Sequence, residues 1–197
     1  MRLAALALVA ILATGCARTS LPTAAMRTGV VAAASVDPLA TKLQALYAEN
    51  FAKLDTDADG AWTAKELELS GRAFKQLLGA FDQDHDGQVT LKEYFPPARL
   101  KKLESDVRSR AEVSASGVGG RVNLPKGKLM FDVYLQDRMP EEAVRTWAIA
   151  EAFHDADTDK TGMLKASELE VALAILEARA DFTDLQRRMT QAIDGGQ

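Results

Sequence analysis

The chain has 197 residues and a formal net charge of −4, because 28 acidic side chains outnumber 24 basic ones. Its 47 % apolar residues can bury a core, and its length fits one ordinary domain or two small lobes. A single cysteine excludes an internal disulfide framework and a cysteine-based zinc cluster. The acidic excess argues against a nucleic-acid partner, which would require a dominant basic face.

Residues 1–16 predict a targeting segment. Arg2 precedes an unbroken apolar run from Leu3 to Ala13, which is shorter than the roughly 20 residues that a membrane-spanning helix requires. These proportions are typical of a secretory signal peptide. The run ends in Ala-Thr-Gly-Cys, and this ending resembles the signal of bacterial lipoproteins, in which small residues precede a cysteine that is lipidated after cleavage. It departs from that pattern at Ala13, where the family usually has leucine.

The resemblance implies that Cys16 carries a lipid anchor and that residues 17–36, rich in Ala, Thr and Ser, form a flexible tether. It also implies an extracytoplasmic protein anchored to a bacterial membrane. Because Ala17 is not aspartate, that membrane would be the outer membrane, at its periplasmic face, in a Gram-negative cell. The alternative is an ordinary cleaved signal with an incidental cysteine, which gives a secreted or soluble periplasmic protein.

From residue 37 the chain is repetitive. Asp37 and Pro38 predict a helix start, and apolar residues follow them at helical spacing as far as residue 54. Residues 55–66 then read DTDADGAWTAKE, and residues 82–93 read DQDHDGQVTLKE. The two segments align at every position, with aspartate at positions 1, 3 and 5, glycine at position 6 and glutamate at position 12.

This spacing suits calcium, which takes six to eight hard oxygen ligands. The aspartates place carboxylates on one side of a tight turn that the glycine allows, and the glutamate reaches back with both oxygens. Both segments resemble the EF-hand loop at each ligand position. The ligands that the resemblance implies are Asp55, Asp57, Asp59, the Ala61 carbonyl and Glu66 in the first loop, and Asp82, Asp84, Asp86, the Gln88 carbonyl and Glu93 in the second.

Residues 157–168, DTDKTGMLKASE, resemble a third such loop. A start at Asp155 would put Ala166 at position 12, where no bidentate ligand is available, so the loop is taken to start at Asp157. Three acidic ligands instead of four, and Lys165 at position 9, should weaken its calcium binding. The ligands here would be Asp157, Asp159, Thr161, the Met163 carbonyl and Glu168.

A fourth unit is expected because EF hands pair to bury their apolar faces. Residues 122–133, VNLPKGKLMFDV, place Gly127 at position 6 and Leu129 at position 8, but their ligand positions cannot hold calcium. We interpret them as a degenerate hand, with a plain loop as the alternative. A basic middle segment, with eight Lys or Arg and three acids between residues 99 and 128, suits an acidic partner or lipid headgroups, or is a solvated face.

The sequence therefore predicts an all-α protein of EF-hand helix–loop–helix units in two paired lobes, with short β-bridges between paired loops. Residues 37–95 would form the first pair, residues 98–180 the second, and residues 181–197 a C-terminal helix and tail that covers the core or fills a groove. The expected function is calcium binding, as a membrane-tethered sensor or a calcium-stabilised interaction module with an unidentified protein partner. The alternative is a structural or scaffold lipoprotein in which calcium only stabilises the fold. We expect no enzyme, because the sequence offers no nucleophile–base pairing, phosphate-binding glycine loop or zinc motif.

Overall fold

The computed structural model describes residues 37–116 and 119–194. The predicted signal peptide, the tether and Cys16 lie outside these described residues. Among the helices within them, none is both long and apolar enough to cross a membrane.

The first half of the described chain contains two helix–loop–helix units. Helix α1 begins with a cap, because the Asp37 side chain accepts a hydrogen bond from the Leu39 N–H, and α2 begins with the equivalent contact from Ala73 to Ser70. Residues 64–68, at the end of the first loop and just beyond it, form turns rather than a helix, and Glu68 has a positive φ of 53°. The elements are α1 (Pro38–Ala52), β1 (Ala61–Trp62), α2 (Gly71–Phe81), β2 (Val89–Thr90) and α3 (Leu91–Tyr94).

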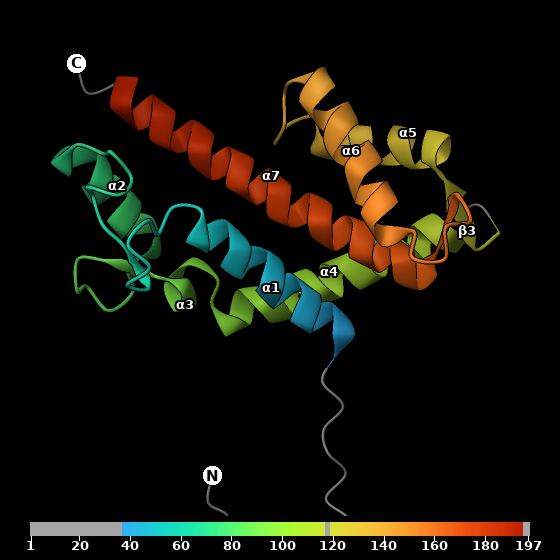
Figure 1. Ribbon diagram of the computed structural model, residues 1–197, viewed down its shortest axis with the longest axis horizontal. Coiled ribbons are helices and arrows are strands. Elements are labelled where there is room, and N and C mark those ends of the chain that lie inside the picture. Colours follow the sequence, from blue (N-terminus) through green and yellow to red (C-terminus); the bar gives the residue numbers. More distant parts are fainter. Residues whose placement is uncertain (1–36, 117–118, 195–197) are drawn as a thin grey trace, which may run out of the picture. The chain divides into compact units, whose positions relative to one another are not determined.

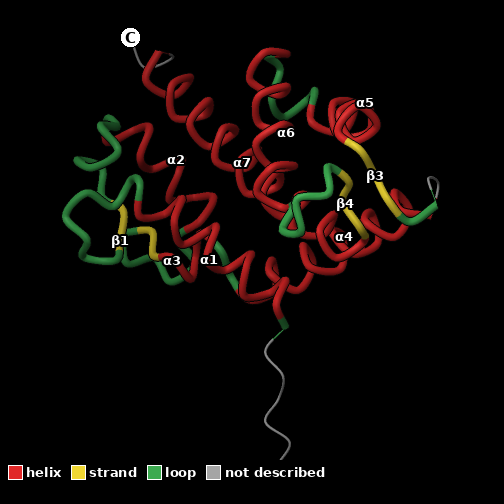
Figure 2. Tube along the Cα trace, turned by 45° about the vertical axis from the view of Figure 1, so that its right-hand side comes forward, coloured by secondary structure: helices red, strands yellow, loops and turns green. Residues whose placement is uncertain are grey.

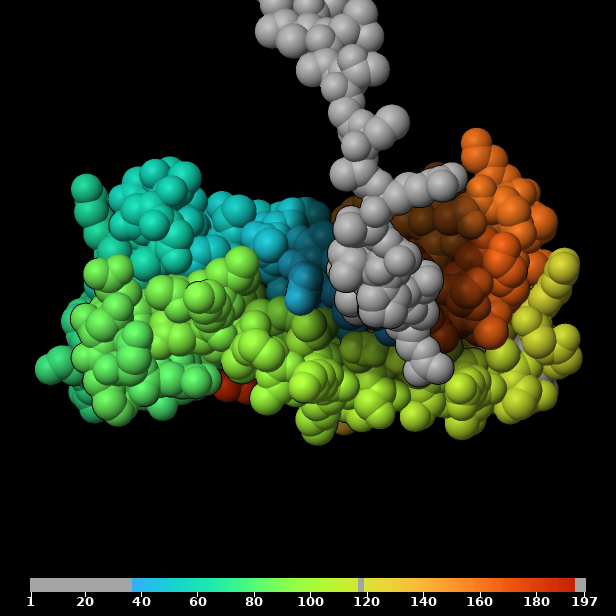
Figure 3. All heavy atoms as spheres, turned by 90° about the horizontal axis from the view of Figure 1, so that it is seen from below, coloured from blue at the N-terminus to red at the C-terminus, as the bar shows by residue number. Residues whose placement is uncertain are grey.

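The second half repeats this organisation with longer helices. Pro97 opens the first of them, where a missing N–H is tolerated. The elements are α4 (Pro97–Ser116), β3 (Arg121–Asn123), α5 (Leu124–Leu135), α6 (Glu142–Ala156), β4 (Met163–Lys165) and α7 (Ala166–Asp194). Figure 3 shows α3 and α4 following one another along a single edge of the molecule, from the first pair to the second.

Two small antiparallel sheets each join a pair of loops (Figure 2). Strand β1 pairs with β2 so that Trp62 lies opposite Val89, and β3 pairs with β4 so that Val122 lies opposite Leu164. These four side chains are fully buried. The predicted fold class is confirmed: helix–loop–helix units form two pairs, and short β-bridges connect the paired loops.

The register predicted for the degenerate hand is wrong by seven residues. Val122, not Leu129, occupies the bridging position opposite Leu164, and Gly120 has the positive φ of 86° that Gly87 has in the second loop. Gly127 lies inside α5, where it packs against Phe131 and Phe153 instead of turning the chain. Since the β-bridge fixes position 8, the degenerate loop spans 115–126.

The C-terminal helix is not a separate element. No glycine or proline interrupts residues 166–194, so α7 continues without a break past the expected boundary near residue 181. Figure 1 shows this helix running from the strands of the second pair towards α2 of the first. It packs against α1, α4 and α6 and also touches α2. Both pairs of hands therefore share one helix.

Two acidic side chains near the middle of α7 form the centre of a polar network, which we call the α7 charge cluster. Glu177 has a side chain only 5 % exposed, and Asp181 lies one turn further along α7. Arg138 donates to both, at 2.7 Å to Glu177 and 2.5 Å to Asp181. The other members contact one of the two acids: Arg110 and Tyr134 contact Glu177, and Arg99 and Tyr47 contact Asp181.

Candidate metal centres

The first loop brings acidic oxygens from both of its ends together. One oxygen each of Asp55, Asp57 and Glu66 lies within 4.8 Å of the other two. Asp55 Oδ2 accepts a hydrogen bond from the Gly60 N–H at 3.1 Å, which closes the turn. Glu66 is fixed across the loop, because its Oε1 accepts from the Thr56 N–H at 2.9 Å. The carboxylate at position 12 is thereby held against the backbone of position 2.

The second loop repeats this arrangement. Asp82, Asp84 and Glu93 form the equivalent group of oxygens. The Gly87 N–H donates to Asp82 Oδ2 at 3.1 Å, and the Gln83 N–H donates to Glu93 Oε1 at 2.8 Å. Two loops of different sequence thus adopt the same hydrogen-bond pattern, which follows from the residues that they share at positions 1, 6 and 12.

Two buried oxygens indicate that these loops are built for a cation. Asp55 Oδ1 and Asp82 Oδ1 are buried and have no hydrogen-bond partner in the described part of the chain. A buried carboxylate oxygen without a donor is costly, whereas a divalent cation would satisfy it. Both belong to a group of three acidic residues, and hard carboxylate oxygens are the ligands that calcium prefers. The residues present therefore fit calcium.

The threonines at position 9 hold the glutamates at position 12. Thr63 donates to Glu66 Oε2 through its N–H at 2.9 Å and its hydroxyl at 2.8 Å, and Thr90 donates to Glu93 Oε2 at 2.8 Å from both groups. Burial raises the pKa of Glu66, but the hydrogen bonds to it outweigh this effect and leave the pKa below its ordinary value. The Thr90 N–H is the main reason that the pKa of Glu93 is lowered. Both glutamates are held in the anionic form that metal binding needs.

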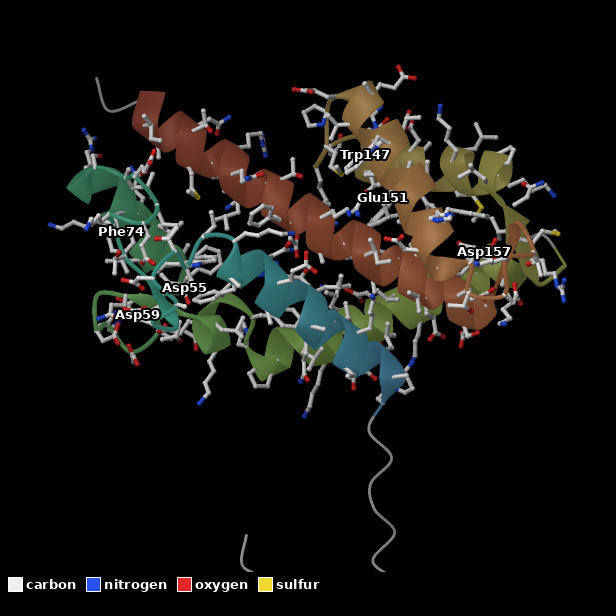
Figure 4. The ribbon with its side chains drawn as sticks, viewed as in Figure 1. Asp55, Asp59, Phe74, Trp147, Glu151 and Asp157 are labelled. Carbon is white, nitrogen blue, oxygen red and sulfur yellow. The ribbon has the colours of Figure 1, made fainter. Side chains whose placement is uncertain are left out.

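The aspartates at position 5 of the first two loops accept hydrogen bonds from the backbone of their own loops. Asp59 Oδ1 accepts from the Ala61 N–H at 2.9 Å, and Asp86 Oδ1 accepts from the Gln88 N–H at 2.8 Å. Neither aspartate belongs to the group of three in its loop. Ala61 is the first residue of β1. Figure 4 shows Asp55 and Asp59 in the loop that follows α1.

The third loop has the same arrangement of carboxylates and backbone, with one additional positive charge from Lys165. Asp157, Asp159 and Glu168 form its group of oxygens, and the Gly162 N–H donates to Asp157 Oδ2 at 2.8 Å. Lys165 stands where the first two loops have threonine. Its Nζ lies 3.2 Å from Asp159 Oδ2 and 3.5 Å from Glu168 Oε1. The ammonium group thus contacts two of the three carboxylates that a cation would use.

The charges in this loop perturb one another. A hydrogen bond from Thr161, followed by one from Lys165, holds the pKa of Asp159 below its ordinary value, and Asp159 in turn raises the pKa of Lys165. The Thr161 hydroxyl also donates to the Met163 carbonyl at 3.0 Å. The sequence already predicted that Lys165 at position 9 weakens calcium binding. Its direct contacts with Asp159 and Glu168 are visible only in the structure.

The degenerate loop has no acidic residue at either end. Ala115 occupies position 1 and Lys126 occupies position 12, and the Asn123 side chain accepts from the Lys126 N–H at 3.1 Å as a helix cap. This loop keeps the β-bridge to the third loop and offers no carboxylate for a metal.

Trp62 connects the first loop to the core. Its indole N–H donates to the Phe51 carbonyl at 3.0 Å, and its ring stacks on Phe51 with centroids 4.6 Å apart. The side chain is fully buried, whereas Trp147, the other tryptophan, is 62 % exposed on α6 (Figure 4). The two tryptophans therefore report on different environments.

Comparison with known families agrees with this geometry. Residues 74–94 match the family model described as EF hand. The match covers most of α2, the whole second loop and α3. The described chain therefore contains an EF-hand domain, with three acidic loops as candidate calcium sites.

Proposed function

We propose that this protein is a membrane-tethered, extracytoplasmic calcium-binding protein that acts as a sensor or as a calcium-stabilised interaction module. The observation that carries the calcium assignment is the pair of buried oxygens, Asp55 Oδ1 and Asp82 Oδ1, which have no hydrogen-bond partner among the described residues and each lie in a loop of EF-hand pattern. Calcium would supply the positive charge that these oxygens lack. The chain's own part is to orient the carboxylates through Gly60, Gly87 and the two position-9 threonines.

The sensor form of the proposal predicts that calcium changes the exposed apolar surface. Calcium titration of the purified domain in the presence of an environment-sensitive hydrophobic dye should give a large, saturable change in dye fluorescence. Extracellular modules of this type bind at about 0.1–1 mM, so the titration should extend into that range. Calcium binding by calorimetry without any dye response would instead favour the structural alternative, in which calcium only stabilises the fold. If calorimetry detects no heat of calcium binding and the dye fluorescence does not change either, the calcium proposal itself is refuted.

The tether is proposed from the sequence of residues 1–16. Expressed in a bacterium, the full chain should enter the detergent phase on phase separation, and Cys16→Ser should move it to the aqueous phase because the acyl chains are lost. Glu93→Gln is the matched control, since it leaves the signal intact and should not change the partition. Equal partition of the Cys16→Ser variant and the full chain would contradict lipidation.

We further propose that the protein is not an enzyme. The three acidic groups are accounted for as calcium ligand sets, which leaves no separate carboxylate pair for acid–base chemistry among them. A hydrolytic activity of the purified protein that disappears with Glu93→Gln would contradict this proposal.

A further inference from the structure

The most exposed apolar side chains of the described residues gather at one groove. Val113 is 73 % exposed on α4, and Leu129 and Val133 are 74 % and 68 % exposed on α5. All three line a groove of about 600 Å³ between the two helices, with Phe131 and Leu173 among its other lining residues. Exposed apolar residues that cluster in this way mark a surface that binds something.

The first pair of hands shows what kind of structure such a surface accommodates. There, the C-terminal part of α7 lies against α2, and Leu185 and Met189 face the same groove as Leu77 and Phe81. Leu185 is buried, and Met189 follows it by one helical turn. The first pair therefore has a helix with apolar residues at i and i+4 on its surface. Over the α4–α5 groove of the second pair, no such helix lies in the part of the chain that the structure describes.

The charge around the α4–α5 groove is positive. Lys126 is exposed and lies one turn before Leu129 and Met130, on the same face of α5. Like Arg121 and Lys128, it has no ion pair with any described carboxylate. These three residues follow one another through β3 and the first turns of α5, at the loop end of the groove.

The acids nearby do not neutralise this charge. Asp132 is paired with Arg145 at 2.9 Å. Glu112 lines a neighbouring hollow on α4, which shares Ser109 with the groove and holds the basic residues Lys101 and Arg108 beside it. A ligand of the groove would therefore bring an apolar face to Val113, Leu129 and Val133 and would place acidic groups near the lysines. A concave groove between two helices fits a helix better than it fits a flat lipid surface.

We propose that the α4–α5 groove binds an amphipathic helix of a partner protein, whose apolar residues stand at i, i+4 and i+7 and whose flank is acidic. The inference rests on the proposed role as an interaction module and names the chemistry of the partner. The apolar contacts provide the affinity, and the cationic end of the groove selects the acidic helix over a basic one.

The test uses a fluorescein-labelled helical peptide of about 16 residues, with leucines at that spacing and glutamates on its flank. A second peptide has lysines in place of the glutamates. Binding to the domain is followed by fluorescence anisotropy, with saturating calcium and with chelator. We expect the acidic peptide to bind at least about tenfold more tightly than the basic one. Leu129→Ser and Val133→Ser should each lower the affinity for the acidic peptide by about tenfold.

Because both side chains are largely exposed, these changes should leave the circular dichroism spectrum unaltered. Ile193→Ser, at an exposed apolar position on α7 outside the groove, is the matched control and should bind as the unsubstituted domain does. Lys126→Glu should weaken binding of the acidic peptide and strengthen binding of the basic peptide. Equal binding of both peptides, or binding insensitive to Leu129→Ser, would overturn the proposal.

Two further outcomes separate this inference from others. Binding to vesicles of anionic phospholipid, without binding to the acidic peptide, would overturn it in favour of a lipid surface. Calorimetry on the same samples measures calcium binding independently. If calcium binds and the peptide does not, only the groove assignment fails, whereas absence of calcium binding defeats the proposed function whatever the peptide does.

Discussion

Replacing Glu93 with glutamine is expected to abolish calcium binding at the second loop while leaving the fold of the first pair intact. Glutamine keeps the shape of the side chain and one acceptor oxygen for the N–H and hydroxyl of Thr90. It removes the negative charge of the residue that would bind the metal with both oxygens. We expect a loss of at least about a hundredfold in affinity, which corresponds to about 2.8 kcal/mol.

The measurement combines calorimetry with terbium luminescence. Trp62 is adjacent to Ala61, whose carbonyl is a predicted ligand, so excitation of tryptophan should sensitise terbium bound in the first loop. Glu66→Gln should remove most of this luminescence. Glu93→Gln should leave the luminescence unchanged and should lower the number of calcium ions bound per chain in calorimetry. Trp147→Phe, on the surface of α6, should leave the signal unchanged. Tryptophan-sensitised luminescence that calcium does not displace would refute the assignment of the first loop.

Lys165→Thr is the control with the opposite sign. It restores the position-9 residue of the first two loops and removes an ammonium group that contacts Asp159 and Glu168. Since that group would repel a divalent cation, affinity at the third loop should rise by about tenfold. A variant that binds calcium no more tightly would mean that the lysine moves aside without cost.

The loops were predictable from the sequence because each ligand position there is set by a local rule. Glycine at position 6 allows the positive φ that Gly60 and Gly87 have, and position 8 forms the β-bridge through Trp62 and Val89. The predicted register of the degenerate loop was wrong because this loop lacks the ligand residues on which those local rules depend. With no carboxylate to mark the ends of this loop, the local pattern does not distinguish Gly127, which was predicted at position 6, from Gly120. Only the pairing of Val122 with Leu164 decides between them.

The connection between the two pairs could not be predicted from local patterns. The apolar residues of α7 keep helical spacing throughout, so the sequence gives no indication of which other helices they contact. Burial of Glu177 was equally hidden, since an acidic residue on a helix is ordinarily solvated. Its partners come from α4, from α5 and from Arg138, at sequence separations of 39 to 67 residues. Such contacts depend on tertiary packing and not on any motif.

Replacing Glu177 with glutamine is expected to destabilise the whole described domain. The change leaves Arg110 and Arg138 facing a neutral group and weakens the hydrogen bond from the Tyr134 hydroxyl, whose pKa is raised to about 12, chiefly by burial and by Glu177. Breaking a buried ion pair from one side costs about 3–5 kcal/mol, and the partial exposure of both arginines places this case near the lower end. A loss of about 3 kcal/mol should lower the melting temperature by about 6–12 °C.

Thermal unfolding followed by circular dichroism, with and without calcium, measures this effect. Asp106→Asn, which breaks the exposed pair with Lys102 at 3.1 Å on α4, is the matched control and should cost less than about 1 kcal/mol. Because α7 belongs to both pairs and Asp181 ties Arg138 to Tyr47 of α1, we expect the two pairs to unfold in one transition. If the Glu177→Gln variant has the same melting temperature as the Asp106→Asn control, the α7 charge cluster does not stabilise the fold. Two separate transitions in the unsubstituted domain would show that the shared helix does not couple the two pairs.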